Sequence, residues 1–183
     1  MLQDTENNLL ERLHDPKTQQ VAFSELVKEF SEVLYWQIRK IVLSHDDAND
    51  VLQNTLIKVW TSIENFRGDS KLSTWLYRIA INEAITFLNK QRAQNNISMD
   101  DADTFLISRL EGDEYFDGDE AQLKLQKAIL TLPEKQRIVF NMKYFDEMKY
   151  EDMSDILETS VGALKASYHH AVKKIEDFLS TDD

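Results

Sequence analysis

Apolar side chains recur at three- and four-residue steps along most of the chain, and this spacing places them on one face of an α-helix. The longest run covers residues 21–42, and further runs follow over residues 51–63 and 73–88. The connections between them are short and polar, and the one at residues 66–71 contains Gly and Ser, which favour loops. Three helices joined in this way are typical of an antiparallel bundle. Residues 21–96 therefore predict one compact helical domain.

A second set of helical patterns occupies residues 121–183. Its first helix is expected to end at Pro133, a residue that suits the first turn of the helix that follows. A short helix over residues 150–157, a three-residue link and a longer helix over residues 161–178 come next, the order found in a helix-turn-helix unit. Ser160 is a good N-cap for the last helix, because its hydroxyl can accept a backbone N–H. The sequence thus predicts an all-α protein of two small helical domains, a three-helix-type bundle and a helix-turn-helix domain.

The last predicted helix separates into two faces. Residues 161–175 contain three lysines and no acidic residue. The apolar residues expected to face inward are Val161, Leu164, Tyr168, Ala171 and Ile175. A helix of this kind can enter a DNA major groove with its lysines close to phosphates. The same pattern equally fits a solvated helix in an ordinary bundle, so it does not by itself predict DNA binding.

Composition supports the helical interpretation. The 183 residues include only four Gly and two Pro, too few for the many tight turns of an all-β chain. Cysteine is absent, which excludes disulfides and thiolate metal sites and fits the reducing cytoplasm, where we expect the protein to act. No apolar run approaches the ~18 residues of a membrane span, and no secretory signal is visible, so membrane insertion is not expected.

The charge is distributed unevenly. The formal net charge is −12, and residues 99–120 hold nine acidic side chains against one arginine. The rest of the chain is therefore close to neutral, and its total charge does not exclude nucleic-acid binding. We expect residues 97–120 to form an acidic flexible linker between the domains, and residues 1–20 to be a polar N-terminal lead. A calcium loop is an alternative for the acidic segment, but the ligand spacing of an EF-hand is not found there.

No pattern of residues indicates enzymatic chemistry. The sequence lacks a Gly-rich phosphate loop, a zinc-protease His pair, a Gly-x-Ser-x-Gly motif and a thiol. The neighbouring His169 and His170 point about 100° apart on a helix and have no third ligand close in sequence, so they do not predict a metal site. We expect no catalytic residues, no metal and no cofactor.

Two groups of motifs resemble one known family. Three stretches closely resemble region 2 of bacterial ECF (extracytoplasmic function) sigma factors: residues 47–60, 66–70 and 73–82. The last of these contains the specific string Trp-Leu-Tyr-Arg-Ile-Ala-x-Asn. Three more resemble region 4 of the same family, in the family's order: residues 130–137, 150–153 and 162–165.

The resemblance implies a promoter-specificity subunit of RNA polymerase and not an enzyme. Such a subunit binds core RNA polymerase, reads the −35 element of promoter DNA with region 4, and captures an unpaired −10 strand with region 2. Many relatives are held inactive by an anti-sigma factor, so the resemblance adds such a factor to the expected partners.

The resemblance also assigns residues of region 2 to these tasks. The polar stripe expected to contact the polymerase is Asp50, Gln53, Asn54 and Lys58. The residues expected to act on the −10 strand are Phe66, Lys71, Arg78 and Asn82. Phe66 would form a pocket wall for an extruded base, and the Asn82 amide would read the base edge. From their helical spacing among aliphatic residues, Trp60 and Trp75 are expected to lie in the core.

In region 4 the resemblance assigns contacts with the −35 element to Lys165, Ser167, His169 and His170, and a phosphate contact to Lys143. Ser167 and His170 stand where many relatives carry arginine, so bidentate reading of guanine is not expected there. Glu158 replaces the usual glycine of the turn, and a positive φ at this residue would cost about 1 kcal/mol.

Two other classes of protein fit the helical pattern. One is a helix-turn-helix transcriptional regulator whose first domain senses a ligand or dimerises. The other is a helical interaction protein that never binds DNA. Neither needs a pocket for an unpaired base, so the stretch from Phe66 to Asn82 favours the sigma factor.

Overall fold

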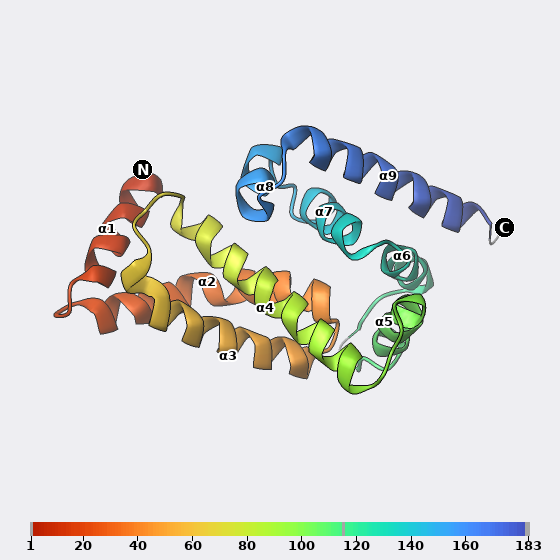
Figure 1. Ribbon diagram of the computed structural model, residues 1–183, viewed down its shortest axis with the longest axis horizontal. Helices are drawn as coiled ribbons and strands as arrows, with labels where there is room; N and C mark the ends of the chain where they lie inside the picture. The colour runs from red at the N-terminus through yellow and green to blue at the C-terminus, as the bar shows by residue number, and fades with distance from the viewer. Residues whose placement is uncertain (1, 115, 182–183) are drawn as a thin grey trace. The chain divides into compact units, whose positions relative to one another are not determined.

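The computed structural model describes residues 2–114 and 116–181, and all regular structure in that part of the chain is helical (Figure 1). The chain divides into two compact units, residues 1–89 (unit 1) and residues 90–183 (unit 2). The all-α prediction with two small helical domains is therefore confirmed.

Unit 1 is a bundle of four helices and a short 3₁₀ helix. Its elements are α1 (Leu2–His14), α2 (Gln19–Val42), α3 (His45–Ser62), η1 (Ile63–Asn65) and most of α4 (Leu72–Gln94). Its most completely buried side chains include Leu26, Leu34 and Ile38 of α2 and Leu76 and Leu88 of α4. Each buried side chain of this size contributes about 1.5–3 kcal/mol to folding, so this apolar interior holds the helices together.

The connection between α2 and α3 is tighter than the sequence pattern predicted. Ser44 is the N-cap of α3, and its Oγ accepts the backbone N–H of Asp47 at 3.4 Å. Asp46 and Asp47 lie in the first turn of α3, where the helix dipole favours negative charge. The polar stretch before Val51 thus belongs to the start of the helix, so α3 begins six residues earlier than its apolar pattern suggested.

The expectation of a polar N-terminal lead over residues 1–20 is wrong. Residues 2–14 form α1, whose Leu9 and Leu13 are buried within unit 1. Arg12 of α1 donates to the carboxylate of Glu25 on α2 at 2.9 Å. The hydrogen bond from Arg12 lowers the pKa of Glu25, and the same bond raises the pKa of Arg12. The apolar face of α1 is short, so the polar residues around it hid it from pattern analysis.

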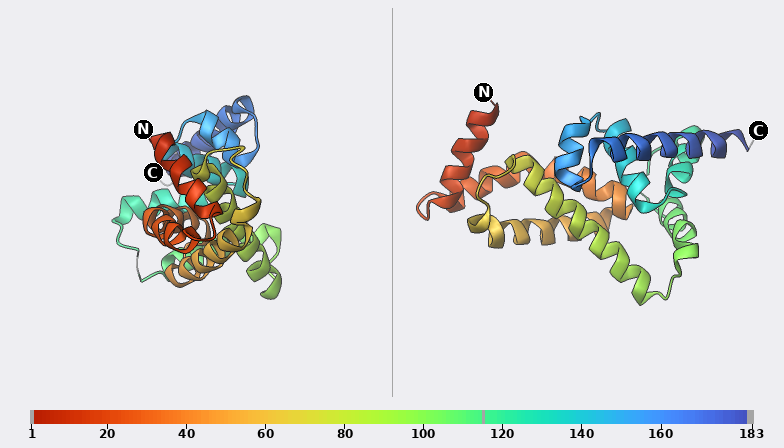
Figure 2. Two further views of the ribbon diagram at one scale, coloured as in Figure 1. Left: turned by 90° about the vertical axis from the view of Figure 1, so that its left-hand side faces the viewer. Right: turned by 45° about the horizontal axis from the view of Figure 1, so that its top comes forward.

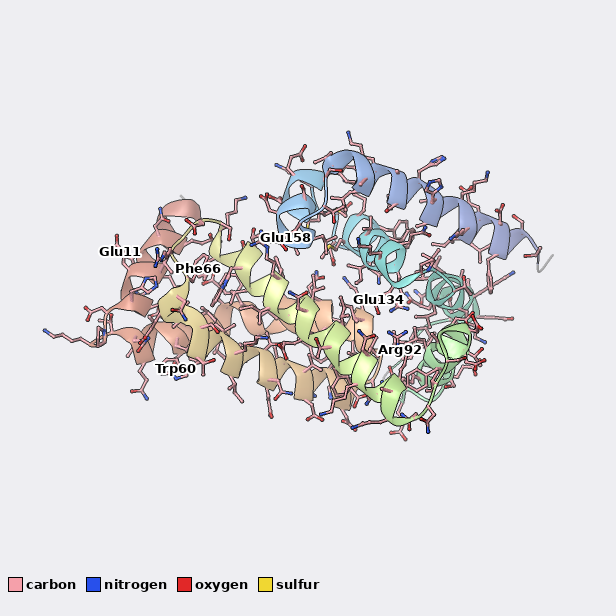
Figure 3. The ribbon with its side chains drawn as sticks, viewed as in Figure 1. Glu11, Trp60, Phe66, Arg92, Glu134 and Glu158 are labelled. Atoms are coloured by element: carbon pink, nitrogen blue, oxygen red, sulfur yellow. The ribbon has the colours of Figure 1, made fainter. Side chains whose placement is uncertain are left out.

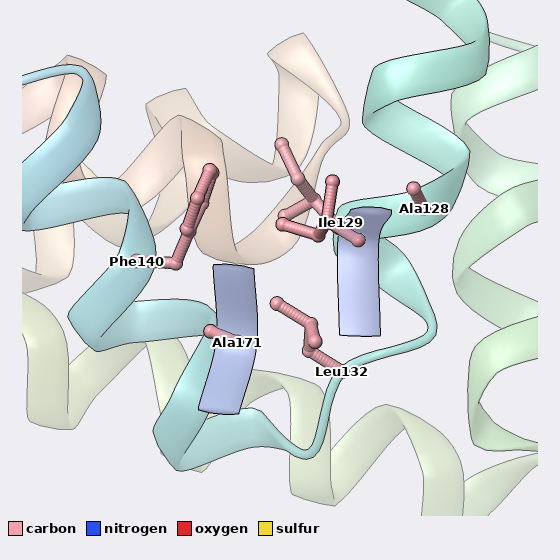
Figure 4. Packing of buried hydrophobic residues seen from close by; sticks show 6 residues of the cluster. Ala128, Ile129, Leu132, Phe140 and Ala171 are labelled. Carbon is pink, nitrogen blue, oxygen red and sulfur yellow. The ribbon is translucent and has the colours of Figure 1, made fainter. Parts of the chain in front are cut away.

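Unit 2 contains the remaining helices. They are η2 (Met99–Asp101), α5 (Ala102–Glu111), α6 (Glu120–Leu130), α7 (Glu134–Tyr144), α8 (Tyr150–Leu157) and α9 (Val161–Ser180). One core cluster joins α6, α7 and α9: Ala128, Ile129, Leu132, Phe140, Ala171 and Ile175 (Figure 4). Packing against this cluster orients α9, so the residues on its opposite side are presented to solvent.

The acidic segment is not flexible linker throughout. It contains η2 and α5, and Leu106 and Leu110 of α5 are buried in unit 2. Glu111 at the end of α5 also pairs with Lys127 of α6 at 2.6 Å. Leu106 and Leu110 lie four residues apart and so share one helix face, a pattern too short to stand out among so many carboxylates.

The helix-turn-helix prediction is confirmed in detail. Helices α8 and α9 have the predicted start points, and Ser160 is the N-cap of α9, with its Oγ accepting the N–H of Ala163 at 3.2 Å. Glu158 ends α8 in the left-handed conformation with φ 52°, as the missing glycine implied (Figure 3). Because the strain at Glu158 amounts to only about 1 kcal/mol, the packing of the two helices can hold it.

Candidate nucleic-acid interface

The polar stripe on α3 is exposed as expected. Asp50, Gln53, Asn54 and Lys58 all lie on the surface, while the opposite face of α3 buries Val51, Thr55 and Val59. Lys58 is held by an ion pair, with its Nζ 2.6 Å from Glu83 Oε1 of α4. The stripe therefore offers one carboxylate and two amides to a partner, beside a lysine fixed to the neighbouring helix.

Two apolar residues join this stripe, and sequence reasoning missed them. Ile57 is 63% exposed and lies one helical turn from Gln53 and Asn54. Trp60 is 40% exposed, so its assignment to the core is wrong (Figure 3). The Trp60 ring meets Phe23 edge-on with centroids 4.8 Å apart. Projecting α3 onto a helical wheel would have found Ile57, because it lies among the polar Gln53, Asn54 and Thr61 and away from the buried Val51, Thr55 and Val59.

A cavity of about 450 Å³ opens between the end of α3, the following loop and the start of α4. Its lining residues are Ser62, Asn65, Phe66, Arg67, Asp69, Ser70, Trp75 and Arg78. The rings of Phe66 and Trp75 stack with centroids 4.8 Å apart and planes 22° apart. The cavity thus combines an aromatic wall with two guanidinium groups and the carboxylate of Asp69, and this lining, with one net positive charge, suits a flat, negatively charged ligand such as a nucleotide.

The structure brings together only part of the predicted −10 group. Phe66 and Arg78 line the cavity, and Trp75, expected in the core, is half-buried and lines it too. Asn82 is exposed one helical turn beyond Arg78 on the same side of α4. Lys71 lies instead at a smaller cavity of about 230 Å³ between the loop and α1.

Helix α1 supports the loop that forms the larger cavity. His14 Nε2 lies 3.0 Å from the carbonyl oxygen of Ile63 and must be the donor there, since a carbonyl only accepts. Leu10 approaches Gly68, whose φ of 78° makes the sharp turn of the loop possible. A Cβ at Gly68 would lie 3.4 Å from Leu10 Cδ2, so the turn passes close to the Leu10 side chain, and both residues line the smaller cavity.

The outward face of α9 carries most of the predicted −35 group. Lys165, His169 and His170 are exposed, and Ser167 is half-buried. The rings of His169 and His170 are 6.0 Å apart and tilted by 58°, and no cluster of three metal-ligating side chains occurs among the described residues. The face therefore carries Lys165 and, one helical turn beyond the histidines, the exposed Lys173, together with side chains that form hydrogen bonds.

Lys143 and Lys165 meet at one aromatic ring. Lys143 Nζ lies 4.6 Å from the ring centroid of Tyr150, and Lys165 Nζ lies 5.7 Å from it. Lys143 also donates to the carbonyl oxygen of Met148 at 3.2 Å. Tyr150 is the first residue of α8, so α7, α8 and α9 each supply one member of this group.

A charged group of a different kind lies inside unit 2. Arg92 and Glu134 pair at 3.3 Å, and Arg137 beside them is only 3% exposed (Figure 3). Burial lowers the pKa of Arg137 to about 10, an effect that Glu134 opposes and Arg92 reinforces. Within the described chain the Nε of Arg137 has no hydrogen-bond partner. The group therefore holds two guanidinium groups and one carboxylate in a largely buried place, where the charge of Arg137 is costly.

Comparison with known families identifies both units. Residues 26–94 match the family described as Sigma-70 region 2, and residues 122–175 match Sigma-70, region 4. The first match contains the cavity and the stripe on α3, and the second contains the helix-turn-helix.

Curated relatives match over nearly the whole chain. The ECF RNA polymerase sigma-E factor of Haemophilus influenzae is 30% identical over 94% of this chain and 94% of its own length. The ECF RNA polymerase sigma factor SigW of Bacillus subtilis is 30% identical over 84% of this chain and 86% of its own length.

Solved structures share the fold. CnrH, solved in complex with the cytosolic domain of CnrY, has a TM-score of 0.70 at 20% identity and covers 97% of this chain and 99% of its own. The sigma factor RpoE of Bartonella quintana, solved with the anti-sigma factor NepR, has a TM-score of 0.64 at 22% identity, covering 88% and 98%. Across the described residues, none of the helices has the length and apolar character needed to cross a bilayer.

Proposed function

The chain belongs to the ECF family of RNA polymerase sigma factors, and we propose that its exposed residues divide promoter recognition between the two units. Sigma factors are transcription-initiation factors and not enzymes, and they act on core RNA polymerase and promoter DNA. In this proposal residues 21–96 bind the polymerase and the −10 element, and residues 121–183 bind the −35 element. The acidic segment of residues 97–120, with α5 inside it, connects them.

The surface proposed for the polymerase is the stripe on α3, extended by Ile57 and Trp60. Asp50 provides charge and the amides of Gln53 and Asn54 provide hydrogen bonds, which fix the register of a partner helix. Ile57 adds an apolar contact at the centre of these polar groups, where removal of water strengthens an interface most. Lys58, already paired with Glu83, is proposed to stand at the edge of this surface.

The single observation that carries the proposal is the cavity walled by Phe66 and Trp75. A base extruded from a duplex loses its stacking partners, and an aromatic surface replaces part of that loss. Arg78 on the cavity wall is suited to hold a phosphate, and Asn82 one turn beyond it carries both a donor and an acceptor for a base edge. Lys71, at the neighbouring cavity, is proposed to contact the backbone of the captured strand.

The exposed face of α9 is proposed to enter the major groove at the −35 element. Lys165 and Lys143 would contact phosphates, and Ser167, His169 and His170 would contact base edges or backbone. Neutral histidine provides one donor and one acceptor, so its readout is weaker than that of arginine. The −35 preference of this protein is therefore expected to be less strict for guanine.

We also propose that the protein acts in the cytoplasm, where core polymerase is found, and that an anti-sigma factor restrains it. The solved sigma factor RpoE of Bartonella quintana, which shares this fold, was captured with the anti-sigma factor NepR. The same exposed stripe on α3 would then serve both the restraining partner and the polymerase in turn.

The test is run-off transcription with purified core polymerase on a promoter library, with and without this chain. Addition of the chain should produce transcripts from a subset of promoters that share −35 and −10 motifs. Asn82→Ala should reduce open-complex formation while leaving core binding intact, and Asp50→Lys should weaken core binding. Failure of the full chain to co-elute with core polymerase would overturn the proposal.

The alternative of a helix-turn-helix regulator with a sensor or dimerisation domain receives no support. Residues 26–94, which would form that domain, match Sigma-70 region 2. A regulator of that class would also bind duplex DNA alone, so the same experiment without polymerase separates the two.

A further inference from the structure

We propose that Tyr150 is a positioning residue whose ring holds Lys143 and Lys165 together, so that the two lysines bind the DNA backbone as one unit. This inference rests on the proposed role of unit 2 at the −35 element. It adds a residue that has no place in the base-reading face of α9, and it predicts that two separate phosphate contacts depend on each other.

The first support is the arrangement of the three helices. Lys143 lies near the end of α7, Tyr150 begins α8, and Lys165 lies in the second turn of α9. The Tyr150 ring is the common neighbour of the two lysines, with its centroid 4.6 Å from one Nζ and 5.7 Å from the other. Two lysines that are distant in sequence are therefore gathered at one point of the surface.

The second support is the chemistry of the ring. The face of an aromatic ring is negative, so it attracts an ammonium group, and this attraction offsets the repulsion between two like charges. Burial raises the pKa of the Tyr150 hydroxyl, and Tyr168 raises it further. The phenol thus stays neutral at physiological pH, and the interaction depends on the ring itself and not on a phenolate.

The third support is the restraint on Lys143. A lysine side chain loses considerable rotamer freedom when it is fixed on a phosphate, and that loss weakens binding. Lys143 is already restrained, because it lies over the ring and donates one proton to the carbonyl oxygen of Met148 at 3.2 Å. Its remaining two N–H groups stay available, so a phosphate can bind with a smaller loss of entropy.

The occupant of this group is the phosphate backbone of DNA. A phosphate beside the two ammonium groups neutralises the charge that the ring only partly offsets, so binding is favoured more than at two separate lysines. Because no base edge is involved, the contribution of the group should be the same at every sequence.

The experiment uses holoenzyme assembled from core polymerase and the full chain, with binding to a fluorescent promoter measured at several salt concentrations. Tyr150→Phe keeps the ring, so its affinity should stay within about twofold of wild type. Tyr150→Leu keeps apolar volume without a ring, and we expect binding about fivefold to tenfold weaker, with the salt slope reduced by about 1. Lys28→Ala is the charge-matched control, since Lys28 is exposed on α2 and belongs to neither proposed group of DNA contacts.

A second measurement does not depend on any tyrosine variant. Lys143→Ala, Lys165→Ala and the double variant form a cycle in the wild-type background. If the ring joins the two lysines, the double variant should lose clearly less affinity than the product of the two single losses. If the affinity loss of the double variant equals the product of the two single losses, the two lysines make independent contacts and the proposal is overturned.

Three further outcomes are decisive. Wild-type affinity and salt slope in a folded Tyr150→Leu holoenzyme would overturn the positioning role. So would a Tyr150→Phe variant as weak as Tyr150→Leu, because the hydroxyl would then be the important group. If removal of the −35 element leaves the promoter affinity of wild-type holoenzyme unchanged, the proposed function of unit 2 is overturned. The cycle of lysine variants would then no longer report on −35 binding.

Discussion

The ring of Trp75 lies stacked on the ring of Phe66, with centroids 4.8 Å apart and planes 22° apart. Phe66 ends the 3₁₀ turn after α3, with its N–H bonded to the carbonyl oxygen of Ile63 at 3.2 Å, and Trp75 lies in the first turn of α4. A stacked pair of this kind adds about 0.5–1.5 kcal/mol beyond the burial of its area. The contact therefore joins the two ends of the loop and builds the aromatic wall of the cavity.

We expect Trp75→Leu to impair promoter opening more than polymerase binding. The variant removes half of the aromatic wall, and loss of stacking costs about 1–3 kcal/mol per base, which corresponds to a decrease in open complexes of about fivefold to 150-fold. Trp75→Phe keeps an aromatic ring and is the matched control. A fluorescent base analogue in the −10 element reports opening, and co-elution reports polymerase binding. Normal opening by Trp75→Leu would contradict the role of the cavity.

We expect Ile57→Ala to weaken polymerase binding without loss of stability. Ile57 is 63% exposed, so its truncation removes little buried area from the free protein. In a complex that covers this side chain, the lost burial should cost about 1–2 kcal/mol, or roughly a tenfold rise in the dissociation constant. Val21→Ala is the control, since Val21 is equally exposed but lies on α2. Equal affinities for Ile57→Ala and wild type would remove Ile57 from the interface.

The elements of both units could be predicted from sequence wherever the apolar pattern was long or the caps were clear. Residues 150–157 and the start of α9 at Val161 are examples, because Ser160 and the short link define the boundary. Helices α1 and α5 were missed, since among the side chains that the structure describes each helix buries only two leucines, at four-residue spacing. Two leucines on one face do not by themselves predict a stable helix, because such a helix is stabilised mainly by packing against a neighbouring helix.

The sequence named residues for a −10 site but could not predict which of them lie together in space. Phe66 and Arg78 share a cavity as expected, whereas Lys71 lies at another one, because the loop turns at Gly68. Trp60 was placed in the core, since helical spacing does not distinguish a buried tryptophan from one at the edge of the apolar face. The common ring of Lys143 and Lys165 depends on three helices, and no local pattern contains it.

We expect Leu10→Ala in α1 to reduce promoter opening although α1 is remote in sequence from the loop. Leu10 packs near Gly68, and its truncation removes support from the turn that carries Phe66. The free energy of unfolding should fall by about 1–2 kcal/mol, because Leu10 is only partly buried. Glu11→Ala is the control, since Glu11 is exposed (Figure 3) and lies on the same helix, the red α1 of Figure 2. Opening is measured with the fluorescent −10 analogue at a temperature where both variants are fully folded, and equal opening would show that α1 does not position the loop.

The buried charge of Arg137 destabilises unit 2, and the direction of its pKa change determines how this effect varies with pH. Burial lowers the pKa of Arg137 from its usual value to about 10, so the unfolded chain binds the proton more tightly than the folded chain. The charged form therefore destabilises the fold at neutral pH, and this penalty shrinks as the pH rises through about 10. Replacement of a buried ionic group by an apolar one of similar size is often neutral or stabilising by about 1–4 kcal/mol. We expect Arg137→Met to raise the free energy of unfolding at pH 7 and to approach wild type above pH 10.

Glu134→Gln is the control variant, and it should change the free energy of unfolding in the opposite direction to Arg137→Met. It leaves Arg92 and Arg137 without the carboxylate between them, so the free energy of unfolding should fall by about 1–3 kcal/mol. Hydrogen exchange of the α7 amides reports local opening, so it measures the stability of unit 2 alone in both variants. If Arg137→Met is destabilised by as much as Glu134→Gln at pH 7, the attraction between Arg137 and Glu134 outweighs the penalty of burial, and the predicted gain in stability is wrong.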